Sequence, residues 1–242
     1  MAFAVVHMQK IKAGGVRGIQ SHIHREHKPR TNPDIDVSRT HENYDILYCR
    51  NFVRQIKETI KNFALKTKTV RKDAVVLCDF IITSDEKTMK AMSHEKQLAF
   101  FKDTVSWFSG RYGEVNVINA TVHMDETTPH LHLSIVPICE ERLSAKSLFD
   151  RKELSALQTD FAQDIGAQYG LERGVKGSER THLSEQRFKL EKIKVDLASA
   201  EKDKELLEAA IAVAGKHPKE LSMELQKAHT SPQIRLERGI TR

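Results

Sequence analysis

Three histidines lie close together in a segment that has the pattern of two β-strands joined by a short turn. The runs 115–123 and 130–138 are rich in β-branched residues and flank a short polar stretch. Alternate residues of a strand point to the same face, so His130 and His132 share a face. If the polar stretch is the turn, His123 lies opposite His130 on the neighbouring strand. The sequence therefore predicts that three imidazoles converge on one patch of a sheet.

Three converging imidazoles favour a divalent metal ion. Three protein ligands leave coordination positions open for a substrate, which is the arrangement of a catalytic metal site. Asp125 and Glu126 follow in the turn, and we expect them at the lip of this site. An isolated His-x-His pair more often binds nothing, but the third histidine and the two carboxylates shift the balance toward a metal. We expect Mn²⁺ or Mg²⁺, although the ligand types alone do not decide the ion.

The charge of the chain is unevenly distributed. Its 242 residues allow one domain with an appendage, and the formal net charge is +6. Residues 1–72 hold fifteen Lys and Arg against six Asp and Glu. A basic N-terminal part beside a metal site favours a polyanionic partner, most simply nucleic acid. Charge alone leaves open the alternative of a merely solvated basic surface.

Two N-terminal stretches have residues that suit phosphate chemistry. The sequence K-I-K-A-G-G-V-R-G places Lys10 and Lys12 beside glycines, where backbone and cations can come close to a phosphate. It lacks the Gly-Lys-Ser/Thr ending of a P-loop. The stretch S-H-I-H-R-E-H follows, with His22, His24 and His27. A histidine beside a phosphate can act as a base or as a nucleophile.

The hydrophobic patterns predict an α+β fold. Residues 3–9 and 74–83 have strand character, and the second run is apolar enough for a central strand. Helical periodicity occurs in three places, beginning at His41, over 87–109, and from a capping box at Asp150 to about Gly170. These elements predict a mostly antiparallel sheet with helices packed mainly on one face and the histidines on the open face.

The C-terminal part has a different pattern. Apolar residues recur at alternating spacings of three and four, at Leu190, Ile193, Leu197, Ala200, Lys204, Leu207, Ile211 and Ala214. Because Lys204 interrupts this short heptad repeat, a dimerising coiled coil and a single helix lying on the domain both fit. We divide the chain into a domain at 1–182, a heptad-patterned helix at 183–214, and a flexible tail or the start of a longer region at 215–242.

The sequence favours a cytoplasmic protein. No stretch approaches the twenty apolar residues of a membrane span, and residues 2–8 are too short for a signal peptide. The cysteines Cys49, Cys78 and Cys139 are odd in number and have no Cys-x-x-Cys spacing. A reduced environment is therefore expected.

Several blocks carry a resemblance to a known family. The segment H-M-D-E-T-T-P-H-L-H resembles the third motif of the MobV-type (Mob/Pre) plasmid mobilisation relaxases, a branch of the HUH endonucleases. The likeness extends from the first residue to about 180. Further blocks are M-Q-K-I-K-A-G-G near the start, H-E-N-Y at 41–44, R-K-D-A-V at 71–75, I-I-T-S-D at 81–85 and L-F-D-R-K-E-L at 148–154. The resemblance implies a bacterial enzyme that nicks one DNA strand at a plasmid transfer origin and later rejoins it.

The resemblance also implies roles for particular residues. The spacing G-x-x-x-H-x-x-R of the family's first motif is matched by Gly18, His22 and Arg25, which implies that His22 attacks the phosphorus and forms a phosphoramidate with the 5′ phosphate. Glu126 would then hold or deprotonate His22. A metal ion on His123, His130 and His132 would polarise the phosphate oxygens. The expected DNA-binding residues are Lys10, Lys12, Arg25, Tyr44, Arg71 and Lys72, with Tyr44 stacking on a base.

Alternatives to this assignment stay open. His24 is another candidate nucleophile because it stands close to His22 in the sequence. Tyr44 is a third, since most HUH relaxases use tyrosine. The H-L-H-L-S-I run also resembles histidine-triad nucleotide hydrolases, but their third histidine would fall on Ser134. A non-catalytic, dimerising DNA-binding regulator with a structural metal site is the remaining class, and such a site normally needs a fourth ligand.

Overall fold

The structure is a computed structural model that describes residues 2–27, 32, 34–174 and 185–214. The chain forms two compact units, the first at Met1–Lys176 and the second at Gly177–Arg242. The tail predicted at 215–242 lies outside the described residues.

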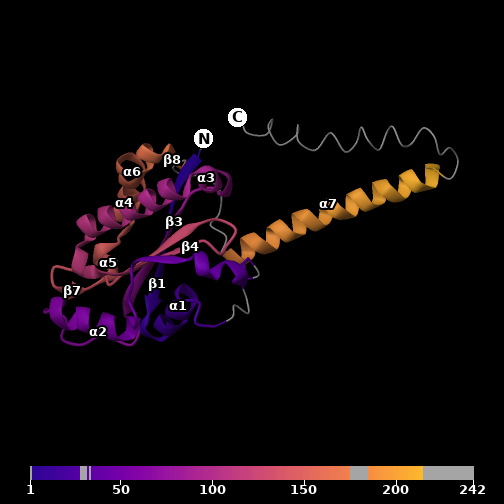
Figure 1. Cartoon of the computed structure of the whole chain (residues 1–242). Helices are drawn as coiled ribbons and strands as arrows, with labels where there is room; N and C mark the ends of the chain where they lie inside the picture. The colour runs from indigo at the N-terminus through magenta and orange to yellow at the C-terminus, as the bar shows by residue number, and fades with distance from the viewer. Residues whose placement is uncertain (1, 28–31, 33, 175–184, 215–242) are drawn as a thin grey trace. The chain divides into compact units, whose positions relative to one another are not determined.

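The first unit is built on a six-stranded sheet (Figure 1) with the order β2-β4-β5-β3-β1-β8. The strands are β1 (Ala2–Lys12), β2 (Tyr44–Leu47), β3 (Val75–Thr83), β4 (Val117–His123), β5 (His130–Ile135) and β8 (Leu171–Arg173). Every neighbouring pair is antiparallel except β1 and β8, which are parallel. A separate two-stranded ribbon joins β6 (Ile138–Cys139) to β7 (Arg142–Leu143). The predicted mainly antiparallel sheet is confirmed.

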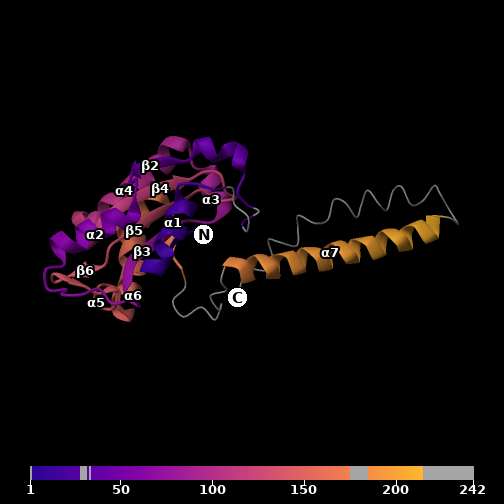
Figure 2. The same ribbon diagram turned by 90° about the horizontal axis from the view of Figure 1, so that it is seen from below.

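Helices cover both faces of this sheet. The α-helices of the first unit are α1 (Val16–Ile23), α2 (Phe52–Phe63), α3 (Glu86–Ala91), α4 (His94–Tyr112), α5 (Ala145–Leu148) and α6 (Arg151–Asp164). Short 3-10 turns are η1 (Ala13–Gly15), η2 (Val37–Glu42), η3 (Glu114–Asn116) and η4 (Gly166–Tyr169). The longest helices, α4 and α6, pack on one face, and α1 and α2 lie on the other, in front of the sheet when it is viewed from below (Figure 2).

Strand alternation separates two buried cores. Phe80, Leu133 and the α4 and α6 aromatics such as Phe161 belong to the larger core. Leu77 on the opposite face joins a smaller core with residues of α1 and α2, such as Phe52. Aromatic and aliphatic burial of this size dominates the stability of a domain. The helices that position the histidine face are therefore anchored by their own apolar contacts.

The predicted α6 cap is confirmed. The side chain of Asp150 accepts a hydrogen bond from the backbone N–H of Glu153 at 2.7 Å, and the helix begins at Arg151. After η4 the chain turns at Gly170, whose φ of 75° is the left-handed region that glycine adopts without steric cost. Strand β8, which no pattern in the sequence predicted, follows directly.

Three local expectations differ from the structure. The helix expected from His41 begins only at Phe52, because Tyr44–Leu47 forms the edge strand β2. The helix expected over 87–109 is two helices, since Ser93 caps a new helix through the N–H of Lys96. The histidines expected on an open face are buried. A four-residue edge strand has too few residues to show a strand period, which explains the first difference.

The second unit contains α7 (Glu185–Ala214), a single 30-residue helix. Its described large apolar side chains are exposed, including Leu197, Leu207 and Ile211. No helix among the described residues is long and apolar enough to cross a membrane.

Candidate active site

The β4–β5 hairpin brings the three predicted histidines together. His123 and His130 are direct partners across the two strands, as the sequence predicted. The ring centroids are 4.7 Å apart for His123 and His132, 5.1 Å for His130 and His132, and 5.2 Å for His123 and His130. Leu131 and Leu133 point to the larger core, so the strand alternation puts His130 and His132 on the opposite face. All three imidazoles are buried.

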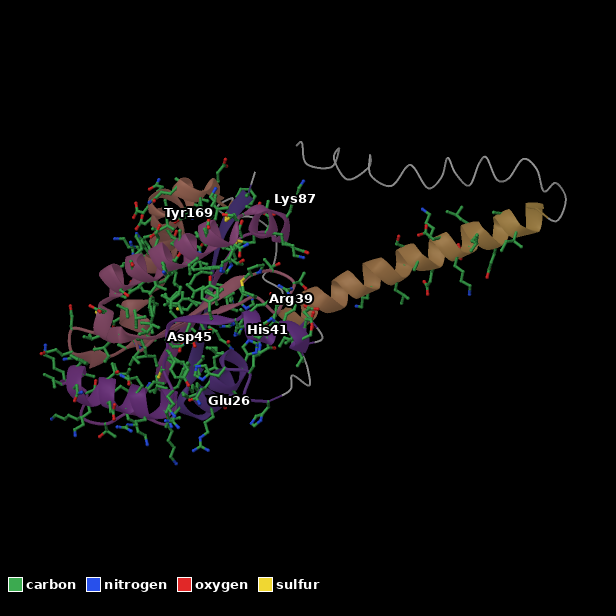
Figure 3. The ribbon with its side chains drawn as sticks, in the orientation of Figure 1. Glu26, Arg39, His41, Asp45, Lys87 and Tyr169 are labelled. Carbon is green, nitrogen blue, oxygen red and sulfur yellow. The ribbon has the colours of Figure 1, made fainter. Side chains whose placement is uncertain are left out.

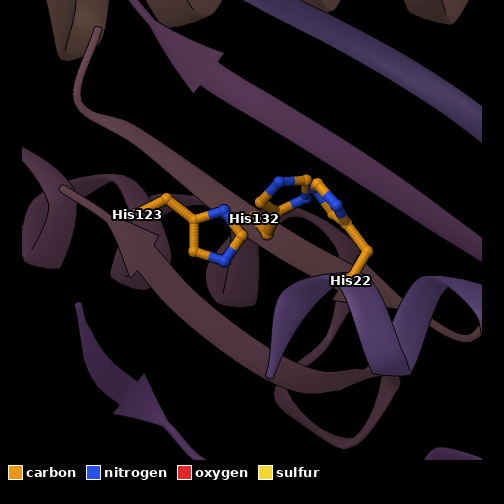
Figure 4. Close-up of side chains that lie close together, drawn as sticks. All are labelled: His22, His123 and His132. Carbon is orange, nitrogen blue, oxygen red and sulfur yellow. The ribbon is translucent and has the colours of Figure 1, made fainter. Parts of the chain in front are cut away.

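Helix α1 places a fourth imidazole over this cluster (Figure 4). The ring of His22 lies 5.2 Å from that of His132 and 5.4 Å from that of His123. Val16 and Ile23, at the two ends of α1, are buried in the smaller core and fix the helix against the sheet. Because Ile23 directly follows His22, its anchoring also sets where the His22 side chain points.

One nitrogen of each sheet histidine donates a hydrogen bond to an oxygen behind the ring. His132 Nδ1 donates to Asp79 Oδ2 at 2.7 Å, and His130 Nδ1 donates to the carbonyl of Thr128 at 2.9 Å. His123 Nε2 donates to the carbonyl of Ile23 at 2.8 Å. A carboxylate or carbonyl behind an imidazole is the pattern that orients a metal-ligating histidine.

The second nitrogens of these rings fit a metal centre. His132 Nε2 is buried and has no hydrogen-bond partner among the described residues, so its lone pair is unsatisfied. Two groups of side chains have ligand atoms within 4.8 Å of one another: His22, His123 and His132, and His123, Glu126 and His130. The donor set of imidazoles with one carboxylate suits a divalent transition metal.

Burial keeps the imidazoles neutral. It lowers the pKa of His123 to about 4 and the pKa of His132 well below its ordinary value. Burial, with His123 and Arg25 nearby, also lowers the pKa of His22 to about 4. Neutral imidazole is the form that binds a metal and the form that attacks as a nucleophile.

Arg25 ties the carboxylates of the turn to the site. Its Nε and Nη2 donate to the two oxygens of Asp125 at 2.9 and 2.7 Å, and Nη2 also donates to Glu126 Oε1 at 2.7 Å. The same Nη2 lies 3.1 Å from His123 Nδ1. The guanidinium is almost fully buried, so it acts within the site and not on the outer surface. Asp125, expected at the lip, is fully buried as its partner.

Glu126 lies between Arg25 and the sheet histidines. Its Oε1 is 3.7 Å from His123 Nδ1 and 3.9 Å from His130 Nε2. Burial disfavours the ionised carboxylate, but the contacts with His123, His130 and Arg25 outweigh this effect and lower the pKa of Glu126. Glu126 is therefore an ionised group facing the histidines, available to a metal or to the cationic Arg25.

The H-E-N-Y block holds the turn in place. The side-chain oxygen of Asn43 accepts the backbone N–H groups of Met124 at 2.7 Å and Asp125 at 3.1 Å. Thr40 donates to Asp125 Oδ2 at 3.0 Å. These contacts were not predicted, because nothing in the sequence joins 40–43 to a turn some eighty residues later.

The other two nucleophile candidates point elsewhere. Tyr44 pairs with Val122 and packs against the larger core, on the opposite side of the sheet from His123, and burial raises its pKa to about 12. His24 packs against Tyr48 and Phe52, with ring centroids 5.2 and 5.4 Å away. Only His22, of these three, contacts the sheet histidines.

The remaining predicted DNA-binding residues are exposed and lie away from the histidines. Lys10 and Lys12 lie toward the end of β1, where their strand partners are Cys78 and Val75. Arg71 and Lys72 precede β3, and Arg71 pairs with Asp73 at 3.2 Å. The structure describes no contact between these four cations and the imidazole cluster.

Comparison with known proteins defines the class of the fold. The structure is similar to the crystal structure of a Mn-bound MobM relaxase domain (MOBV; Mob_Pre) with plasmid pMV158 oriT DNA, with a TM-score of 0.73 and 36% identity over 77% of this chain and 97% of that one. A second solved structure of that domain, bound to 26-nucleotide pMV158 oriT DNA, has a TM-score of 0.64 and 33% identity over 77% of this chain and 99% of that one. The fold is therefore that of a DNA relaxase domain.

The family follows from the sequence. The family model described as "Plasmid recombination enzyme" (Mob_Pre) matches residues 1–190, and the chain belongs to this family. A plasmid recombination enzyme from Bacillus sp is 38% identical over 218 residues, covering 88% of this chain and 52% of the relative. A plasmid recombination enzyme type 2 from Staphylococcus aureus is 40% identical, covering 84% and 49%. The chain spans about half the length of these relatives.

The Asp79–His132 pair yields a direct test of the metal centre. Asp79→Asn replaces the carboxyl group behind His132 with an amide, and we expect the Mn²⁺ affinity of the protein to fall roughly 10- to 100-fold, as measured by isothermal titration calorimetry. Ser134→Ala is the matched control, because Ser134 donates to the other Asp79 oxygen at 2.7 Å without contacting His132. Equal affinities for the two folded variants would contradict a metal on His132.

Proposed function

We propose that this chain nicks one strand of a plasmid transfer origin by transesterification and later reseals it, as a mobilisation relaxase. The observation that carries the proposal is the position of His22, a neutral imidazole lying against the sheet histidines, of which His132 has an unsatisfied nitrogen that suits a metal ion. The relatives of known structure, relaxase domains bound to oriT DNA, support the same substrate class.

In the proposed reaction a His22 nitrogen attacks phosphorus. A P–N bond forms, the bond to the 3′ oxygen breaks, and that oxygen takes up a proton. The ring becomes neutral again when its other N–H proton is lost to solvent. The 5′ phosphate then remains on the protein as a phosphoramidate, and attack by the 3′ hydroxyl reverses the step. Conserving the bond energy in the adduct makes resealing possible without another energy source.

His123, His130 and His132 would hold the divalent cation, Mn²⁺ or Mg²⁺, with Glu126 beside them. Such an ion polarises the phosphate oxygens and stabilises the charge of the transition state. Arg25 and Glu126 would orient the groups that react. Arg25 lies 3.4 Å from His22 Nδ1 and holds the turn carboxylates. A carboxylate with a lowered pKa is a weak base, so we assign Glu126 to orienting Arg25, the sheet histidines and the nucleophile more than to accepting a proton.

Single-stranded DNA is the proposed partner. Arg71 and Lys72 precede β3 and Lys10 and Lys12 lie on β1, all four exposed, where they can neutralise backbone phosphates. Phosphate contacts supply much of the affinity of such proteins for DNA. The family match supports the same assignment.

One observation favours a second function. The ligand atoms of His22, His123 and His132 lie close enough together to share one ion. If His22 bound the ion together with the three sheet histidines, all four positions of a tetrahedral site would be filled by protein ligands, as in a structural metal centre. In that case the protein would be a non-catalytic DNA-binding regulator. A histidine-triad hydrolase is not supported, because Ser134 occupies the third strand position and is bonded to Asp79.

Adduct formation separates these functions. Wild-type protein, Mn²⁺ and a single-stranded oligonucleotide with the cognate origin should give a covalent protein–DNA adduct that is labile in mild acid, seen on a denaturing gel. His22→Ala should form none, because it lacks the nucleophile. His24→Ala and Tyr44→Phe, the matched controls, should form it. An acid-stable adduct lost only in Tyr44→Phe would mean a tyrosine nucleophile, and no adduct from wild type would favour the regulator.

We propose in addition that α7 pairs two copies of the chain. Leu197, Leu207 and Ile211 lie on one heptad-spaced face and are 58%, 51% and 62% exposed in the single chain. Exposed apolar side chains at this spacing are the seam of a coiled coil.

A charge on this seam should prevent pairing. L197E/I211E should sediment as a monomer, because two carboxylates would be buried at the dimer seam, whereas wild type should sediment as a dimer. Leu206→Glu is the matched control, since Leu206 is 61% exposed but lies off the heptad face. A monomeric wild type, or a seam variant that remains dimeric, would show that α7 does not join the subunits.

A further inference from the structure

An unassigned basic strip lies beside the helix that carries His22. Arg54, Lys57 and Lys61 follow one another at spacings of three and four along α2, so they lie on one face over about two turns, roughly 11 Å. Arg50 precedes the helix, and exposed Tyr48 precedes Arg50. We call Tyr48, Arg50, Arg54, Lys57 and Lys61 the α2 strip.

The strip is not an ordinary charge-balanced helix surface. Between residues 50 and 72 the sequence has eight Lys and Arg and a single acidic residue, Glu58. Glu58 pairs with Arg54 at 2.8 Å, but both side chains are highly exposed, so the pair is weak and exchangeable. The apolar face of α2 is used separately, with Phe52 and Ile56 buried in the smaller core. The helix backbone therefore fixes where Arg54, Lys57 and Lys61 project, and their exposed side chains do not serve the core.

The strip is bordered by two hollows that meet at Arg54. One, of about 950 Å³, lies between α1 and α2 and is lined by Arg17, Gly18, Ser21, Arg54 and Lys57 among others. The other, of about 420 Å³, is lined by Tyr48, Arg50 and Arg54 among others. Gly18 and Ser21 precede His22 on α1, so the first hollow runs beside the helix of the proposed nucleophile.

Tyr48 presents an aromatic face at one end of the strip. Tyr48 is 59% exposed as a residue, and its ring packs on that of His24 with a centroid distance of 5.2 Å and an interplanar angle of 34°. His24 in turn contacts the fully buried Phe52 edge-on at 5.4 Å. This support holds Tyr48 in position while its outer face is open. Unpaired bases stack on such platforms, whereas the bases of a duplex are already stacked on one another.

We infer that the α2 strip binds single-stranded DNA next to the segment that is cleaved, with Tyr48 stacking on a base and Arg50, Arg54, Lys57 and Lys61 neutralising backbone phosphates. The inference rests on the proposed function for its DNA partner. It adds a docking surface outside the histidine site and outside the cations at Lys10, Lys12, Arg71 and Lys72. The contacts are to base faces and phosphates, so they are independent of DNA sequence.

Binding of a fluorescein-labelled oligothymidylate, followed by anisotropy at several salt concentrations, tests the inference without requiring cleavage. R54Q/K57Q/K61Q should bind more weakly, and the slope of log K against log[salt] should become shallower by about 2, since each single-strand phosphate contact contributes about 0.7. The matched control is K87Q/K96Q/K102Q on α3 and α4. It removes the same charge from exposed lysines on the other side of the sheet, where Figure 3 labels Lys87.

Tyr48 provides the second arm of the experiment. Tyr48→Ala should weaken binding about 5- to 150-fold, the loss of one base–aromatic stack, and Tyr48→Phe should bind like wild type. Equal weakening by the strip and control triples would overturn the inference, because only net charge would then matter. Loss of duplex binding with intact oligothymidylate binding would overturn the single-strand assignment.

The outcome is separable from the proposed reaction. If wild type forms no adduct with origin DNA but the strip variants lose oligothymidylate binding selectively, the strip stands and the nickase proposal fails. If wild type forms the adduct and the strip variants bind oligothymidylate as the control triple does, the nickase proposal stands and the inference about the α2 strip is wrong.

Discussion

The site depends on the register of one hairpin. Because His123 faces His130 directly, and His132 follows two residues later, three imidazoles share a face within 5.2 Å of one another. A shift of one residue would turn His130 and His132 into the larger core and Leu131 onto the site. Asn43 stabilises the observed register by accepting a backbone hydrogen bond from the turn. The burial of Leu131 and Leu133 stabilises it too, because a shifted register would move these side chains out of the core.

Burial then sets the chemistry of the cluster. The low pKa values of His22 and His123 follow mainly from removal of the rings from water, and each sheet histidine donates one N–H to an oxygen behind it. The result is a set of neutral, oriented nitrogens with one unsatisfied lone pair at His132. Arg25 pairs with both ionised carboxylates, Asp125 and Glu126, and offsets one of the two negative charges in the same buried volume.

Strand alternation made much of this site predictable from sequence. The pairing of His123 with His130, the direction of Leu131 into the core and the cap at Asp150 all follow from local period and spacing. Contacts between distant segments did not follow. No local pattern predicts that α1 packs over the histidines or that Arg25 pairs with Asp125. The segment that contains Tyr44 was predicted to be helical, because a four-residue edge strand shows no clear period. Tertiary packing decides such positions.

The central claim is that the sheet histidines hold the metal while His22 remains free to attack. Titration of metal-free protein with Mn²⁺, followed by the loss of the free-ion electron paramagnetic resonance signal, tests it most directly in His130→Ala and His22→Ala. The account predicts that His130→Ala loses tight Mn²⁺ binding and that His22→Ala retains it. Loss of binding in His22→Ala with retention in His130→Ala would identify His22 as a ligand and contradict its role as the nucleophile.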